Sequence, residues 1–310
     1  MPKFSAQKPE ARRGWPFLRN LLVALALTSV GILLVLRSPH ILQKVLGLLV
    51  LGSMFAHFVE LQHQCLHGSA FKSAKANRLI GTLLGMPMLV SFSHYRVTHL
   101  YHHRFLGTEQ DREFFQYDSS SRLTLGRLLR SAFNVARYAK LARNAWGAWH
   151  GRSPADCEGA PEHIKAHIMG EYRLMTGGLG VALALALVGY APAVAMLWLL
   201  PLLLVAEPLH LLIELPEHIL CNASVKDPFF NTRTIKGSRL SFWFTNGNNF
   251  HSEHHFMPGV PIHELPRLHV EVKDRLTVYE RSYPAFYRRI LTVAWQNTFR
   301  GVSLAGKGPP

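Results

Sequence analysis

Four long apolar runs constrain the fold of this chain more than any other feature. They cover residues 21–36, 41–59, 174–190 and 192–212. Each run is close to the ~20 residues with which a helix crosses a bilayer. A helix can do so because it satisfies its own backbone hydrogen bonds in lipid. Only a few residues separate the runs of each pair, so the sequence predicts an all-α integral membrane protein with four transmembrane helices in two hairpins.

Positive charge is concentrated outside these hairpins. Residues 93–173 and 219–310 carry twelve Lys and Arg each, whereas the turns within the hairpins carry one Arg between them. The positive-inside rule therefore places both termini and the middle segment in the cytoplasm. This topology explains the formal net charge of +15 without nucleic acid, because no binding motif accompanies the charge. We expect a protein of a bacterial inner membrane.

The same pattern divides the chain. We expect a cytosolic N-terminal tail at 1–18, a single membrane domain at 19–300 and a C-terminal tail at 301–310. A removable signal peptide competes for the first run, but Arg37-Ser-Pro follows it instead of a small-residue cleavage site. Residues 79–92 are apolar but short and interrupted by glycine and proline. They indicate a re-entrant or interfacial segment rather than a fifth span.

Nine histidines occur in three boxes and one isolated position. The boxes have the spacings H-x-x-x-H, H-x-x-H-H and H-x-x-H-H. Side chains three or four residues apart lie on the same face of a helix, and imidazole is a ligand that suits iron, zinc and copper. The nine are His63 and His67, then His99, His102 and His103, then His251, His254 and His255, with His218 standing alone.

Topology brings these histidines to one face of the membrane. If the helix of the second run continues from Ile41 through His67, the first box leaves the bilayer on the cytoplasmic side. The fourth run ends near His218 on the same side, and the other two boxes lie in cytoplasmic segments. Zinc needs only about four ligands, so nine imidazoles predict two metal ions at the cytoplasmic face of the membrane.

Four further polar residues could orient these ligands. Glu214 and Glu217 precede His218 within about one helical turn, and Glu253 lies inside the third box. Carboxylates near a ligand imidazole commonly fix its orientation, and Glu214 could also bind metal through a water. His210 shares the helical stripe of His218, and its place in or near the metal site stays open. The other eight histidines are interpreted as surface or satisfied core residues.

These motifs resemble those of the membrane fatty acid desaturase and hydroxylase superfamily over most of the chain. Tyr95-Arg-Val-Thr-His-Leu-Tyr-His-His103 is similar to the second box of the family. Thr232-Arg-Thr234 and Asn249-Phe-His-Ser-Glu-His-His-Phe-Met-Pro-Gly-Val-Pro261 are similar to its third region, and Glu217-His218 stands where relatives carry an isolated histidine ligand. Some relatives have Asn four residues before that histidine, whereas this chain has Glu214.

The resemblance implies four transmembrane helices, a cytosolic cap and a non-haem di-iron centre. It also implies O₂-dependent attack on an unactivated C–H bond of a fatty acyl or lipid-like chain, with a double bond as the product. Phospholipid, acyl-CoA and acyl carrier protein are all compatible carriers of that chain. We find no cytochrome b5 signature and no cysteine pattern for an iron–sulfur cluster. A separate ferredoxin-like electron donor and its reductase are therefore expected.

Three other functions are compatible with parts of this pattern. A hydroxylase or acetylenase would use the same scaffold and differ only in the fate of the substrate. A metal transporter would need histidines and acids lining a path along the spans, whereas the boxes lie outside them. An inactive relative would be expected to have incomplete boxes, and these are intact.

Overall fold

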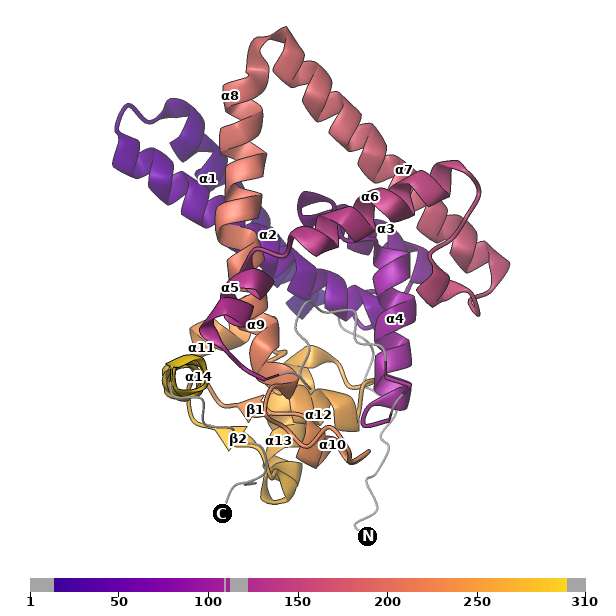
Figure 1. Ribbon diagram of the computed structural model, residues 1–310, viewed down its shortest axis with the longest axis vertical. Coiled ribbons are helices and arrows are strands. Elements are labelled where there is room, and N and C mark those ends of the chain that lie inside the picture. The colour runs from indigo at the N-terminus through magenta and orange to yellow at the C-terminus, as the bar shows by residue number, and fades with distance from the viewer. Residues whose placement is uncertain (1–13, 109, 112–121, 300–310) are drawn as a thin grey trace.

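The computed structural model describes residues 14–108, 110–111 and 122–299. Most of the predicted N-terminal tail and the whole of the predicted tail at 301–310 lie outside these residues. The described chain is mainly helical (Figure 1). Its helices are α1 (Trp15–Arg37), α2 (Ile41–Leu66), α3 (Ala74–Gly85), α4 (Phe92–Phe105), α5 (Leu125–Ala132), α6 (Val135–Trp149), α7 (Glu162–Leu185), α8 (Ala191–Val194), α9 (Glu207–His218), α10 (Pro228–Asn231), α11 (Arg239–Phe244), α12 (His251–Phe256), α13 (Leu265–Val272) and α14 (Tyr283–Phe299). The two strands are β1 (Thr234–Ile235) and β2 (Tyr279–Glu280), which pair in parallel.

Three helical stretches of the described chain are long and apolar enough to cross a membrane. They are Trp15–Arg37, Ile41–Leu66 and Glu162–His218. The stretch Ile41–Leu66 is helix α2, which ends at Leu66 and is capped by His67. This confirms that the helix of the second apolar run continues through the first histidine box. At ~1.5 Å per residue, its 26 residues extend about 39 Å, which exceeds the ~30 Å hydrocarbon core.

The third stretch contains a sharp bend. Val188 and Gly189 have non-helical backbone angles, and Gly189 has a φ of 103°, which a residue with a Cβ rarely adopts. Figure 1 shows α7 and α8 meeting at this bend, from which the two arms diverge. The predicted third and fourth runs therefore lie on opposite arms. The second arm contains π-helical segments at Ala195–Leu199 and Pro201–Ala206 before it becomes α9.

α2 is the central helix of the apolar part. Its glycines allow two neighbours to approach closely, because a Cβ on Gly47 would lie 2.8 Å from the carbonyl oxygen of Gly31 in α1. A Cβ on Gly52 would lie 2.6 Å from the carbonyl oxygen of Pro201 on the other side. α2 is thus held between α1 and the arm that leads to α9, and this fixes where its last turn lies.

Residues 79–92 form no long helix. They comprise the second half of α3, a 3₁₀ turn at Met86–Met88 and Leu89 in the left-handed region at φ 55°. α3 has 12 residues, too few to cross a bilayer. Membrane re-entry of this segment stays a prediction.

The first turn of α4 is fixed by a buried carboxylate. Ser91 caps the helix, because its hydroxyl accepts a hydrogen bond from His94 N. Glu171 of α7 accepts from Ser93 N at 2.8 Å and from the hydroxyls of Ser91 and Ser93 at 2.7 and 2.6 Å. A carboxylate at a helix N-terminus is stabilised by the helix dipole. α7 therefore anchors the helix that carries the second histidine box.

The third box lies on α12, which sits beside the small sheet. Ile235 N donates to Asn249 O, and Asn249 Nδ2 donates back to Ile235 O, both at 2.8 Å. Beneath α12, an apolar cluster that includes Phe229, Phe250 and Leu265 packs it against α10 and α13. α12 is only six residues long, so these contacts rather than helix propensity hold its histidines in place.

Candidate metal centre

Four helices bring the nine box histidines together. α2 carries His63 and is capped by His67, α4 carries the second box, α9 ends at His218 and α12 carries the third box. Their ligand nitrogens fall into two groups, and within each group they lie within 4.8 Å of one another. The first group is His63, His67, His99, His103 and His254, and the second is His102, His218, His251 and His255.

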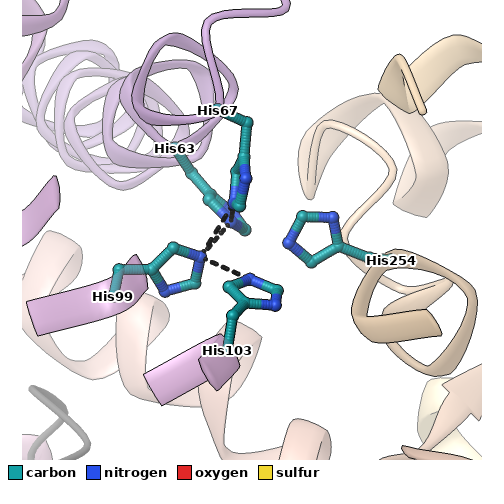
Figure 2. Close-up of side chains that lie close together, drawn as sticks. All are labelled: His63, His67, His99, His103 and His254. Atoms are coloured by element: carbon teal, nitrogen blue, oxygen red, sulfur yellow. Dashed lines mark hydrogen bonds between the residues drawn. The ribbon is translucent and has the colours of Figure 1, made fainter. Parts of the chain in front are cut away.

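The first group converges on one point. Figure 2 shows His63 and His67 pointing from α2, His99 and His103 from α4, and His254 from the opposite side. The Nε2 atom of His99 lies 2.9 Å from Nε2 of His63 and 3.0 Å from Nε2 of both His67 and His103. The ring of His254 is centred 4.5 Å from that of His67 and closes the group.

The second group is built around α12. Nε2 of His251 lies 3.0 Å from Nε2 of His218, and the rings of His102 and His255 are centred 4.9 Å apart. The two groups are adjacent, because the rings of His103 and His255 stack at 4.1 Å. Each group is buried or nearly so.

Each H-x-x-H-H box serves both groups. In the second box, His99 and His103 join the first group and His102 joins the second. In the third box, His251 and His255 join the second group and His254 joins the first. Neighbouring residues on an α-helix point about 100° apart, whereas residues i and i+4 nearly coincide in direction. The two adjacent histidines of each box therefore point into different groups.

A metal ion fits each group better than hydrogen bonding does. A ring nitrogen carries at most one proton, so His99 Nε2 cannot form a good hydrogen bond with three neighbouring Nε2 atoms at once. Both ring nitrogens of His254 and of His255 are buried without a hydrogen-bond partner among the described residues. Such groups cost free energy when left unpaired. The ring nitrogens of each group point their lone pairs at a common centre without enough protons to pair them by hydrogen bonds. Such an arrangement suits a cation.

Burial keeps these imidazoles in the neutral form that binds metal. It lowers the pKa of six of the seven box histidines outside the long apolar helices well below 6.5, and repulsion between neighbouring imidazoles lowers it further. These six are His67, His99, His103, His251, His254 and His255. A neutral imidazole offers a lone pair, so this low pKa prepares each ring as a ligand.

Three oxygen atoms orient three of the four imidazoles of the second group. Nδ1 of His102 lies 2.8 Å from Oδ1 of Asp111, Nδ1 of His251 lies 3.0 Å from Oδ1 of Asn248, and Nδ1 of His218 lies 3.0 Å from Asn231 O. Because Nδ1–H donates to these oxygens, Nε2 is left as the ligand atom. Sequence reasoning missed all three acceptors. Asn248 could have been found, since it lies three residues before His251.

The four residues expected to orient the ligands have different surroundings. Glu217 lies beside the second group, where Oε1 accepts from Asn248 Nδ2 at 2.5 Å and Oε2 is 3.4 Å from His251 Nε2. Glu214 is buried against His210, with 3.0 Å between Oε1 and Nε2. Neither Glu214 nor His210 belongs to either group of converging nitrogens. Their participation in metal binding stays a prediction.

Glu253 is fully buried and connects α12 to two other elements. Its Oε2 accepts from the hydroxyl of Thr234 at 2.6 Å, and its Oε1 lies 2.5 Å from Nδ1 of His269 in α13. The contacts of Glu253 therefore position α12 as a whole against β1 and α13. They explain why a carboxylate stands between the histidines of the third box.

Arg233 fixes the end of α9 beside His218. Its guanidinium is 1% exposed and donates to the carbonyl oxygens of Pro216 and Ile219 at 2.5 and 2.6 Å. The last carbonyls of a helix lack partners within the helix, and the planar guanidinium can satisfy two of them together. Arg233 of the Thr-Arg-Thr motif thus holds the backbone on both sides of His218.

A third cluster of ligand-type residues is held by ordinary hydrogen bonds. His94, Asp156 and Cys157 lie close together. Nδ1 of His94 is 2.6 Å from the hydroxyl of Tyr172, Nε2 of His94 is 2.9 Å from Asp156, and Lys140 donates to the other oxygen of Asp156 at 2.9 Å. His94 is therefore a satisfied core histidine that links α4 to α7 and to the segment after α6.

Comparisons with known proteins agree with this geometry. The fatty acid desaturase family matches residues 39–287. A dihydrorhizobitoxine desaturase from Bradyrhizobium elkanii is 25% identical over 244 residues, which cover 73% of this chain and 67% of that protein. An acyl-lipid (9-3)-desaturase from Physcomitrium patens is 24% identical over 295 residues, which cover 85% of this chain and 55% of that protein. The chain thus spans about half the length of the second relative.

The family match carries weight because the matched segment contains the whole candidate metal centre. All nine box histidines, Asp111 and Arg233 lie within residues 39–287. Two proteins named as desaturases match across the same chain, although at low identity. These matches and the paired imidazole groups show that the chain belongs to the fatty acid desaturase family of oxidoreductases.

Proposed function

We propose that this chain is an O₂-dependent di-iron desaturase that introduces a double bond into a fatty acyl or lipid-like chain. The observation that carries this proposal is the division of nine imidazoles into two adjacent groups of five and four. Nine ligands exceed what a structural zinc site uses. Imidazole is a suitable ligand for iron, and the match to the fatty acid desaturase family favours iron over the other metals that imidazole binds.

The proposed arrangement in the membrane has four spans in two hairpins below a cytosolic cap. α1 and α2 form the first hairpin, and the bend at Val188 and Gly189 divides the third apolar stretch into the second. The basic segments 93–173 and 219–310 support a cytoplasmic location for the cap and both termini. We place the protein in a bacterial inner membrane.

The protein side chains would prepare the site for oxidation chemistry. Two bound irons would supply the capacity to reduce O₂ and to remove hydrogen from an unactivated carbon. The histidines of α2, α4, α9 and α12 would hold the irons. Asp111, Asn231 and Asn248 would keep three imidazoles in the correct orientation. Burial of the groups limits access of water, which favours reaction at a positioned substrate carbon.

The reaction requires two external electrons. Formation of the double bond removes two hydrogen atoms from neighbouring carbons, and reduction of O₂ to two waters takes up four electrons and four protons in all. The remaining two electrons would come from a ferredoxin-like donor and its reductase. The strongly basic cytoplasmic segments would attract an acidic donor.

Expression in a host of known lipid profile tests the proposal. The chain is produced under air with a compatible ferredoxin, and total fatty acids are analysed by mass spectrometry beside metal content. We expect new unsaturated chains and two irons per protein. Analysis of phospholipid, acyl-CoA and acyl carrier protein fractions would identify the carrier on which the unsaturated chain first appears.

The two imidazole groups provide matched variants. His254→Ala removes a ligand from the first group and His255→Ala from the second, so each is expected to lower iron from two toward one per chain and to abolish the product. His163→Ala is the control, because His163 is exposed at the start of α7. New hydroxylated or acetylenic chains would replace the desaturase proposal by the related oxygenase function. Wild-type protein that binds no iron would refute it.

A further inference from the structure

A basic cavity lies at the C-terminal end of α6, away from the metal centre. Its volume is about 550 Å³, and it is bounded by the last turns of α6 and the segment that follows them. Lys140, Arg143 and Arg152 line it, with Asp156 as the only carboxylate among its lining residues. The proposed reaction does not use these residues.

The charge balance of this cavity favours an anion. Asp156 is already neutralised, because its two oxygens contact His94 and Lys140 at 2.9 Å. Arg143 and Arg152 are exposed, and neither guanidinium has an ion pair within the described part of the chain. Two guanidinium groups beside a satisfied carboxylate provide donors of the geometry that phosphate oxygens accept.

Contacts with α7 place the cavity beside the point where the charged first part of α7 gives way to its uncharged, apolar part. Arg173 donates to Ala148 O, and the indole nitrogen of Trp149 donates to the hydroxyl of Thr176. Arg173 is the last charged residue of α7 before an uncharged stretch that continues to Ala206. The end of α6 therefore packs on α7 where the chain passes from charged to lipid-compatible sequence (Figure 1).

Exposed tryptophans mark the same place. Trp146 lines the cavity and is 66% exposed, and Trp149 is 60% exposed. They continue an apolar stripe along the exposed face of α6 that starts at Val135, which is 78% exposed. Tryptophan is enriched where headgroups meet hydrocarbon, because its ring is apolar and its N–H is polar. An acidic protein partner would leave this stripe unexplained.

We propose that the C-terminal end of α6 and the segment after it form a binding site for the phosphate headgroup of an anionic phospholipid. Arg143 and Arg152 bind the phosphate, and Trp146 and Trp149 enter the interfacial layer beside it. The inference rests on the proposed membrane position of α7 but not on the proposed reaction. The site tethers α6 to the membrane surface, and through His94 and Asp156 it connects to the helix that carries the second histidine box.

Native mass spectrometry of the full chain in detergent tests this site. The protein is titrated with dioleoylphosphatidylglycerol and, separately, with dioleoylphosphatidylcholine. We expect tighter binding of phosphatidylglycerol and a loss of roughly 10- to 30-fold in the Arg143→Gln, Arg152→Gln variant, since each cation near a lipid surface contributes roughly fivefold. The control is Arg127→Gln, Arg130→Gln, which removes the same charge from the exposed surface of α5.

Several results would overturn the proposal. Equal binding of both lipids, or equal loss in the test and control variants, would show that no specific site exists. Competition by inorganic phosphate at the concentration of the lipid would indicate a soluble phosphate compound instead. Loss of ferredoxin binding with retained phosphatidylglycerol binding would identify a protein-docking surface.

If the double variant does not fold, the single variants carry the test, each with a loss of roughly fivefold. Because the readout is lipid binding, it is independent of desaturation.

Discussion

At the scale of single residues, direction along a helix decides which of the two imidazole groups each histidine joins. His102 and His103 are neighbours in sequence, yet they belong to different groups. The same holds for His254 and His255. Because residues i and i+4 point the same way and residue i+3 does not coincide with them, one H-x-x-H-H box can contribute to both imidazole groups. The spacing is thus a way to bridge two sites with one rigid helix.

Asp111 is the residue whose removal most directly tests this orientation. We expect Asp111→Ala to lower iron affinity about 10- to 100-fold, which is the usual cost of losing a hydrogen-bond acceptor behind a metal-binding histidine. The reason is that His102 Nδ1 loses its carboxylate partner. Chelator competition followed by metal analysis measures the effect. The control is Asp274→Ala, an exposed aspartate, and equal affinities in the two variants would disprove the orienting role.

At the scale of elements, α2 positions the first box by fitting closely between its neighbours. A rigid helix transmits its position along its length, so contacts near its middle fix the histidines at its end. Gly52 is the tightest of these contacts, because an added Cβ would lie 2.3 Å from Cβ of Val205. Overpacking at such a contact forces the backbones apart.

We therefore expect Gly52→Ala to destabilise the protein by about 1–3 kcal/mol. Gly180→Ala on α7 is the matched control, because a Cβ there would meet no atom within 4 Å. It should leave stability unchanged or raise it slightly, since alanine is the better helix former. Thermal unfolding in detergent, followed by circular dichroism, compares the two. Identical melting temperatures would contradict the close packing of α2.

At the scale of the whole molecule, four helices together bury histidines and so keep them uncharged. Their folded-state pKa lies well below 6.5, the value expected in the unfolded chain. Between these two values the unfolded chain binds more protons than the folded one. Stability is therefore complete above about pH 6.5 and falls as the pH drops below it. This behaviour belongs to the assembled group of helices, since no single helix buries its own histidines.

Metal-free protein should accordingly lose thermal stability between pH 6.5 and pH 5 and keep it unchanged from pH 7 to pH 8. Iron-loaded protein should release its metal over the acidic part of the same range, because protonated imidazole does not bind iron. Melting temperatures and iron content measured in parallel across this range test both statements. A melting temperature that stays constant down to pH 5 would show that the imidazoles are not buried in the neutral form.

The sequence by itself determined the helical membrane character, the length of α2 through the first box and the identity of the nine histidines. These follow from local rules, since apolar length sets a helix that can cross a bilayer and spacing sets which side chains share a helix face. Such properties depend on residues close together in the chain.

Only the tertiary structure decided how the boxes combine. It placed His254 with the histidines of α2 and α4, and His218 with those of α12. It also revealed Asp111 as an orienting group, and it directed Glu253 toward Thr234 and His269. These pairings join residues from different elements, and they depend on helix positions that close backbone contacts set. Periodicity describes one helix at a time, whereas a metal centre is defined by the directions in which several helices meet.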